Sequence, residues 1–117
     1  MSMLDLGADT AGLAPLPRAF LAGLGALLDE LRPARLDAGI TKATRRDDGV
    51  EVVLAHAHEP AWSIWAQAAR DGVLVGCGAL HAEHTRAGDA LALVADLLGG
   101  RREVPGYAGA RLRPDFR

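Results

Sequence analysis

The stretch AWSIWAQAARDGVLVGCGALH, residues 61–81, decides the fold. It contains two runs in which apolar and other residues alternate, and Arg70-Asp71-Gly72 separates the runs. A period of two is typical of strands, and Asp-Gly between two such runs is a strong hairpin signal because the tight turn needs a positive φ. The stretch therefore predicts strands over 61–69 and 73–81, joined by a tight turn.

Two further runs with the same alternation precede this stretch, at residues 39–46 (GITKATRR) and 50–58 (VEVVLAHAH). Asp47-Asp48-Gly49 lies between them and repeats the hairpin signal, and Glu59-Pro60 separates the second run from residue 61. Four short strands with short connections predict an antiparallel meander, because neighbouring antiparallel strands need only tight turns.

Apolar residues at helical spacing occur along the chain both before and after the predicted meander. The first stripe begins after two prolines, ends before Pro33, and consists of Phe20, Leu24, Leu27, Leu28 and Leu31. The second stripe ends at Gly99-Gly100 and consists of Leu91, Val94, Ala95 and Leu98. Two helices can cover one face of a sheet. We therefore expect an α+β, two-layer sandwich with an N-terminal helix, a four-stranded antiparallel meander, a second helix and a possible short C-terminal edge strand near Tyr107–Leu112.

At 117 residues the chain is long enough for one domain with a modest core. Residues 1–12 contain Gly and Asp without a clear period, so we expect a loose N-terminal tail there. Residues 13–117 then form a single α+β domain, in which 101–117 is a loop-rich basic tail. The only aromatic residues near the arginines of this tail are Tyr107 and Phe116, so nucleic-acid binding is not expected.

Composition limits the partners and the compartment. The formal net charge of -2 gives no overall field for nucleic acid or an anionic membrane, and Cys77 is the only cysteine, which suits a reducing cytoplasm. The N-terminus lacks the basic region of a signal peptide, and the longest apolar stretch, 19–28, is too short to span a bilayer. Arginine replaces lysine almost throughout, and alanine and glycine are abundant, as in high-GC bacterial genomes. We expect a cytoplasmic bacterial protein without membrane contact.

Both faces of the predicted sheet carry apolar residues, whereas an antiparallel sheet with one solvated face should alternate more cleanly. We therefore expect the face without helices to be covered, most simply by a second copy of the chain, and contact with another protein is also open. Trp62 and Trp65 are assigned to opposite faces of the third strand, so one of them points outward. Tryptophan is a favoured interface anchor. The two tryptophans are therefore the candidate interface residues, and the sequence leaves open which of them faces outward.

All four histidines lie in two short segments. His56 and His58 end the second predicted strand, and His81, Glu83 and His84 end the fourth. In a meander the second and fourth strands finish at the same end of the sheet. These residues then offer imidazole and carboxylate groups for a divalent transition metal or for acid–base chemistry. The same residues are ordinary components of solvated strand ends. Both interpretations stay open, and solvated strand ends are favoured.

No nucleotide-binding loop and no serine-nucleophile motif occurs, so no catalytic residue is assigned and a non-enzymatic role is favoured. In element order and size, the layout is similar to that of small bacterial α+β proteins that act by binding, including immunity proteins of toxin systems and secretion chaperones. The leading hypothesis is a cytoplasmic, homodimeric protein-interaction domain of immunity- or chaperone-like type, with no cofactor. The alternative is a small metal- or ligand-binding protein, an enzyme included, that uses the His/Glu residues.

Overall fold

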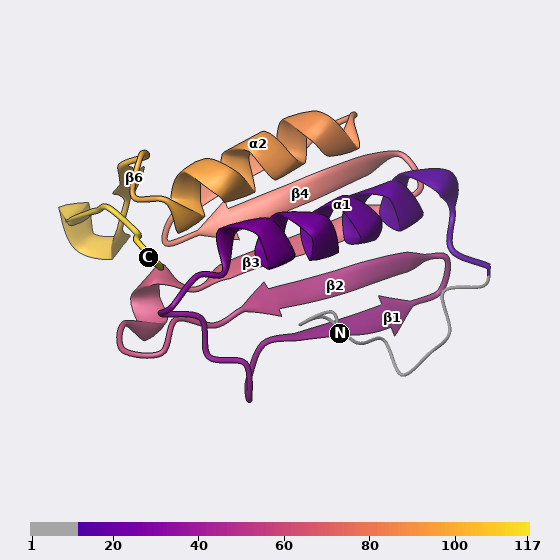
Figure 1. Cartoon of the computed structure of the whole chain (residues 1–117). Helices are drawn as coiled ribbons and strands as arrows, with labels where there is room; N and C mark the ends of the chain where they lie inside the picture. Colours follow the sequence, from indigo (N-terminus) through magenta and orange to yellow (C-terminus); the bar gives the residue numbers. More distant parts are fainter. Residues whose placement is uncertain (1–11) are drawn as a thin grey trace.

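The computed structural model describes residues 12–117, and in this range a helix, five strands, a second helix and a two-stranded ribbon follow one another. The two helices, α1 (Pro15–Leu31) and α2 (Ala87–Leu98), lie side by side over one face of the main sheet (Figure 1). The main sheet is antiparallel, and its strands, in spatial order, are β1 (Lys42–Arg46), β2 (Gly49–Leu54), β3 (Ile64–Ala69), β4 (Gly72–Cys77) and β5 (Leu80–His84). The predicted two-layer α+β sandwich is confirmed. The loose tail predicted for 1–12 lies outside the described residues, apart from Gly12.

The meander has five strands in the structure, one more than the sequence predicts. The predicted strand over 73–81 is divided at Gly78, whose φ of 58° suits the first central position of a type II′ turn. β5 then runs back along β4, with Leu80 opposite Cys77 and His84 opposite Val73. Gly78 lies inside a continuous alternating run, so the periodicity gave no sign of this turn.

Both predicted hairpins are present, but the glycine of each has a different role from the one expected. The two-residue turns are 47–48 and 70–71, and the glycine after each turn is the first residue of the next strand. In the first turn the positive φ, 54°, belongs to Asp47. A Cβ on Gly49 would collide with the carbonyl group of Ala68 on β3. Glycine is therefore required at this position because two backbones approach closely.

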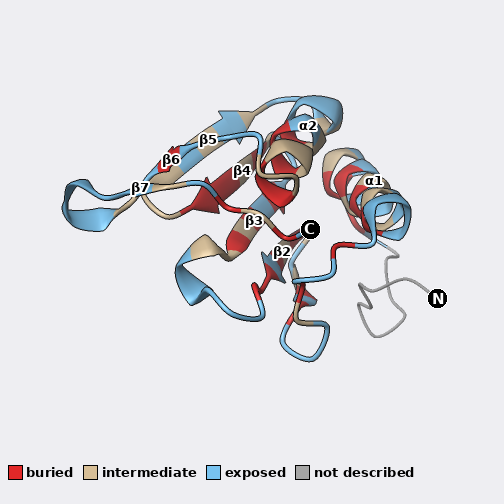
Figure 2. Cartoon of the chain, turned by 60° about the vertical axis from the view of Figure 1, so that its left-hand side comes forward, coloured by how far each residue is buried: buried red, intermediate tan, exposed pale blue. Residues whose placement is uncertain are grey.

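The hydrophobic core lies between the helices and the inner face of the sheet (Figure 2). The fully buried large side chains of this core include Phe20, Leu24, Leu28, Val52, Leu54, Ile64, Val73, Val75, Leu97 and Leu98. Arg32 caps the C-terminus of α1: it takes a left-handed φ of 45° and donates its N–H to the carbonyl of Leu28. Gly23 on α1 lies against Leu91 of α2, and a Cβ at this glycine would collide with that leucine. The helices thus cover one face of the sheet and leave the alternate residues of each strand on the other.

The C-terminal segment is rich in loops, as the sequence predicts, but its end is part of the core. Phe116 is completely buried, its N–H donates to the carbonyl of Leu98, and its carbonyl accepts the N–H of Arg35. The short strand predicted near Tyr107–Leu112 is β7 (Arg111–Leu112), which pairs with β6 (Val104–Pro105) in a ribbon of its own. This strand is therefore not an edge of the main sheet.

Candidate functional site

The structure separates the two groups of predicted His/Glu residues: Glu83 and His84 lie toward the opposite end of the sheet from His56 and His58, and His81 lies three strands away from β2. His56 and His58 follow β2, whereas His81, Glu83 and His84 are residues of β5. Because β5 runs back along β4, His84 lies opposite Val73, at the end of the sheet where β2 begins. The expectation that the two clusters meet at one sheet end is therefore wrong, because it depended on a fourth strand that continued to residue 81.

The distance across the sheet also separates the two clusters. His81 shares a row with Gly76, Trp65 and Val53, so three strand spacings separate it from β2. At roughly 4.8 Å for each spacing this is about 14 Å, too far for shared coordination of one ion. Within residues 12–117, no group of three or more His, Cys, Asp or Glu side chains is placed to hold a metal ion. Metal binding by individual members of the set stays a prediction.

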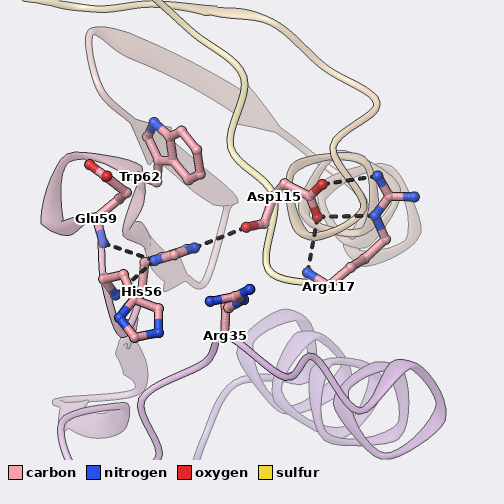
Figure 3. Close-up of a pocket in the computed structure, with 7 residues that line it drawn as sticks. Arg35, His56, Glu59, Trp62, Asp115 and Arg117 are labelled. Atoms are coloured by element: carbon pink, nitrogen blue, oxygen red, sulfur yellow. Dashed lines mark hydrogen bonds and ion pairs between the residues drawn. The ribbon is translucent and has the colours of Figure 1, made fainter.

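His56 is the most constrained of these side chains. It is 7% exposed, and its Nδ1 atom accepts hydrogen bonds from the backbone N–H groups of His58, at 3.1 Å, and Glu59, at 2.9 Å. Nε2 must then carry the ring hydrogen, which it donates to the carbonyl of Asp115 at 2.9 Å (Figure 3). Both nitrogens are occupied by backbone groups. His56 is thus a structural residue that has no lone pair left for a metal or for a substrate proton.

Aromatic packing completes the surroundings of the His56 ring. Its centroid lies 5.2 Å from that of Trp62 and 4.7 Å from that of Phe116, both in edge-to-face geometry. The sequence contained no sign of this cluster, because Asp115 and Phe116 are about 60 residues away along the chain and belong to the predicted loop-rich basic tail. Only tertiary contacts bring the C-terminal segment against the loop after β2.

A pocket with a volume of about 350 Å³ lies next to His56 (Figure 3). Its lining residues are Arg35, His56, His58, Glu59, Trp62, Asp115 and Arg117. A bidentate hydrogen bond from the Arg117 guanidinium and one from its backbone N–H lower the pKa of Asp115 from 3.8 to about 2. Arg117 is thereby engaged with Asp115 at the rim of the pocket. The lining contains no cysteine or serine, and its buried histidine has both ring nitrogens occupied, so no nucleophile–base pair is assembled there.

The two tryptophans differ in their surroundings, and Trp65 is the one that faces outward. Trp62 lies before β3, in the 3-10 turn η1 (Pro60–Trp62), and packs on His56. Trp65 is half-buried on the face without helices, and its ring lies where a Cβ of Gly76 would be. The same ring reaches His81 of β5, with 5.2 Å between the centroids. The glycine in β4 therefore lets the indole lie flat across the sheet.

We call the side of the main sheet opposite the helices the open face. The strand register places on it Lys42, Thr44, Arg46, Glu51, Val53, Trp65, Gln67, Leu74, Gly76, His81 and Glu83. Its centre is apolar, with Trp65, half-buried Leu74 and Val53, which is 36% exposed. Polar groups surround this centre, and Glu51 binds both Gln67, at 3.1 Å, and Arg46, at 3.0 Å. An apolar centre with a polar rim is typical of protein–protein contact surfaces.

The open face continues into a groove at one end. The groove has a volume of about 460 Å³ and lies between η1, the turn after β4 and the β6–β7 ribbon. Trp65 and Tyr107 are its aromatic residues, and Tyr107 is 75% exposed. The apolar area available for contact therefore extends past the end of the strands.

Cys77 lies on the inner face of β4 and is completely buried, and its Sγ–H donates to the carbonyl of Trp62 at 3.5 Å. Burial raises the pKa of this thiol from 9.0 to about 11, which leaves about 100-fold less thiolate at neutral pH. We expect the native protein to react with a thiol reagent at least about 100-fold more slowly than the protein unfolded in denaturant. Rapid stoichiometric labelling under native conditions, followed by mass spectrometry, would contradict this placement.

No helix of residues 12–117 is long and apolar enough to cross a membrane. Comparisons of the chain with models of known protein families, with curated proteins and with solved structures found no match.

Proposed function

We propose that this chain is a non-enzymatic protein-interaction domain that works as a homodimer, with Trp65 of the open face at its contact surface. The observation that carries the proposal is the half-buried Trp65 ring on a sheet face that neither helix of residues 12–117 covers. Binding of the immunity or chaperone type is a role that needs such a surface and no catalytic group. The composition and the single cysteine favour the bacterial cytoplasm.

The packing of Trp65 supports a role in binding. Its indole lies on the backbone at Gly76 and against the ring of His81, so little side-chain freedom remains to be lost when a partner covers it. Tryptophans held in this way are among the residues that contribute most to binding energy at interfaces. Val53 and Leu74 on neighbouring strands supply further apolar area beside it.

Two of the groups that could support catalysis, His56 and Cys77, are engaged in the core of the described part of the chain. Both nitrogens of His56 bind backbone groups, and the Cys77 thiol is buried with a raised pKa. No arrangement within residues 12–117 favours the metal-binding alternative. A binding function therefore accounts for more of the structure than an enzymatic one does.

We expect Trp65→Ala to weaken homodimerisation by about 30-fold or more, the usual effect of removing an interface anchor. Sedimentation velocity over a wide range of protein concentration measures the dissociation constant. The matched control is Leu31→Ala, which removes an exposed apolar side chain, 43% exposed, from the end of α1 in the other layer. We expect this control to dimerise as the unsubstituted protein does.

Protection of the Cys77 thiol verifies that each variant is folded. Either of two results would overturn the proposal. The first is an unsubstituted protein that sediments as a monomer at every concentration. The second is equal dimerisation of Trp65→Ala and Leu31→Ala.

A further inference from the structure

We infer that the second copy joins through β5, so that the β5 edges of two chains pair antiparallel about a two-fold axis at Ala82 and form one continuous ten-stranded sheet. This inference rests on the proposed function, because it names the place at which the homodimer forms.

The outer edge of β5 has backbone groups free to accept another strand. In a two-residue hairpin the residues that flank the turn, here Cys77 and Leu80, form the hydrogen-bonded pair, and every second residue after them repeats that pattern. Leu80, Ala82 and His84 therefore direct their N–H and C=O groups toward β4. His81 and Glu83 direct theirs outward, where no residue in 12–117 binds them.

One end of this edge is already occupied. The N–H of Ala79, in the turn before β5, donates to the carbonyl of Pro105 at 2.8 Å. The β6–β7 ribbon thus blocks extension of the edge at residue 79 and leaves the groups of His81 and Glu83 accessible. A partner strand has to be centred near Ala82.

Only one self-paired register places unlike groups opposite each other. With Ala82 opposite Ala82 of the second copy, each His81 faces a Glu83, and both residues form hydrogen-bonded pairs with their outward backbone groups. An imidazole N–H can donate to the facing carboxylate, and cross-strand pairs of this kind stabilise sheets. Moving the two-fold axis by one residue, to position 81 or 83, places His81 opposite His81 or Glu83 opposite Glu83. The sequence LHAEH is therefore complementary to itself about its central alanine.

The other edge of the sheet opposes self-pairing. β1 has the sequence KATRR, so three of its five residues are cations. If Thr44 were opposite Thr44 of a second copy, each Lys42 would face an Arg46. Charged residues on exposed edges are a common means of preventing strand addition. The chain thus has one edge protected by like charge and one edge whose polar side chains complement those of a second copy.

In this dimer the two-fold axis is perpendicular to the sheet, so both open faces lie on the same side and all four helices on the other. Trp65 supports the contact because its ring packs against His81, the residue that faces Glu83 of the second copy. β3 of one chain and β3 of the other are five strand spacings apart, which places the two Trp65 residues about 24 Å from each other. Trp65 therefore acts on this dimer through His81, and Trp65→Ala is expected to weaken it by releasing the His81 ring.

The test exchanges the facing groups. In His81→Glu the new glutamate of each chain faces Glu83 of the other, so the dimer contains two pairs of facing glutamates. We expect the dissociation constant to rise about tenfold. Glu83→Lys places Lys opposite His and is also expected to weaken the dimer. The double variant His81→Glu with Glu83→Lys restores unlike pairs and is expected to recover dimerisation. Lys42→Glu, the matched charge reversal on β1, is expected to leave the dissociation constant unchanged.

A cross-link tests the register directly. Ala82 lies in a pair without backbone hydrogen bonds, in which the facing Cα atoms are about 4.5 Å apart, within the range of a disulfide. We expect Ala82→Cys to form a disulfide-linked dimer on mild oxidation, with native Cys77 remaining buried. Thr44→Cys, at the centre of β1, is the control that should remain unlinked.

The outcomes separate this inference from the proposed function. If Trp65→Ala abolishes the dimer while the charge variants and Ala82→Cys have no effect, the second copy covers the open face and the β5 contact is wrong, although the proposed function stands. Species larger than a dimer that disappear with Lys42→Glu would indicate head-to-tail pairing of β1 with β5, which also overturns the inference. A monomer at every concentration overturns both.

Discussion

Replacing His56 with Ala is expected to lower the free energy of unfolding by about 3 to 5 kcal/mol. The change leaves the N–H groups of His58 and Glu59 and the carbonyl of Asp115 without their partner. It also opens a space between Trp62 and Phe116, which pack on the ring. Chemical denaturation monitored by tryptophan fluorescence measures the effect.

Two further variants divide this loss into its parts. His56→Phe keeps an aromatic ring in the site and removes only the hydrogen bonds, so we expect a smaller loss, of about 2 kcal/mol. His58→Ala removes a neighbouring, exposed histidine and is expected to change stability by no more than about 0.5 kcal/mol. A loss below about 1 kcal/mol for His56→Ala would mean that the ring does not hold the loop and the C-terminal segment together.

Phe116→Ala is the second substitution with a large expected effect, a loss of about 3 to 5 kcal/mol. The side chain is completely buried, although it lies in a segment rich in arginine and loops. Its removal leaves a cavity beside His56 and loosens the contact between the C-terminal segment and α2. Thermal or chemical unfolding measures the loss.

Tyr107→Ala is the matched control for Phe116→Ala, because Tyr107 is the 75% exposed aromatic residue of the same segment. We expect this control to change stability by no more than about 0.5 kcal/mol. The double variant of His56 and Phe116 should lose less than the sum of the single losses, since the two rings are in contact, with centroids 4.7 Å apart. Strict additivity would contradict a shared cluster, and equal effects of Phe116→Ala and Tyr107→Ala would contradict the burial of Phe116.

The sequence predicts local structure well where a periodic pattern extends over a whole element. The stripe from Phe20 to Leu31 and the alternation over 50–54 and 64–69 correspond to α1, β2 and β3. These features depend on neighbours two to four residues apart, so a single segment contains the information.

The candidate site was less predictable, because one turn changes the position of a whole strand. The assignment of His81, Glu83 and His84 to a strand end depended on a strand that continued through Gly78. The positive φ at this glycine reverses the chain and turns the three residues into an edge strand. A side chain's distance from others across the sheet follows from strand order, and a single unrecognised turn changes that order.

The sequence by itself determined the layers and the alternation of faces along the strands, because hydrophobic periodicity is a local property of the chain. Only the tertiary structure decided that Trp65 rather than Trp62 faces outward, that His56 is fully hydrogen-bonded, and that Phe116 completes the core. Each of these depends on contacts between segments far apart in the sequence, such as the hydrogen bond between His56 and Asp115. Such contacts form when the apolar surface of the whole chain is buried at once, and no local pattern specifies them.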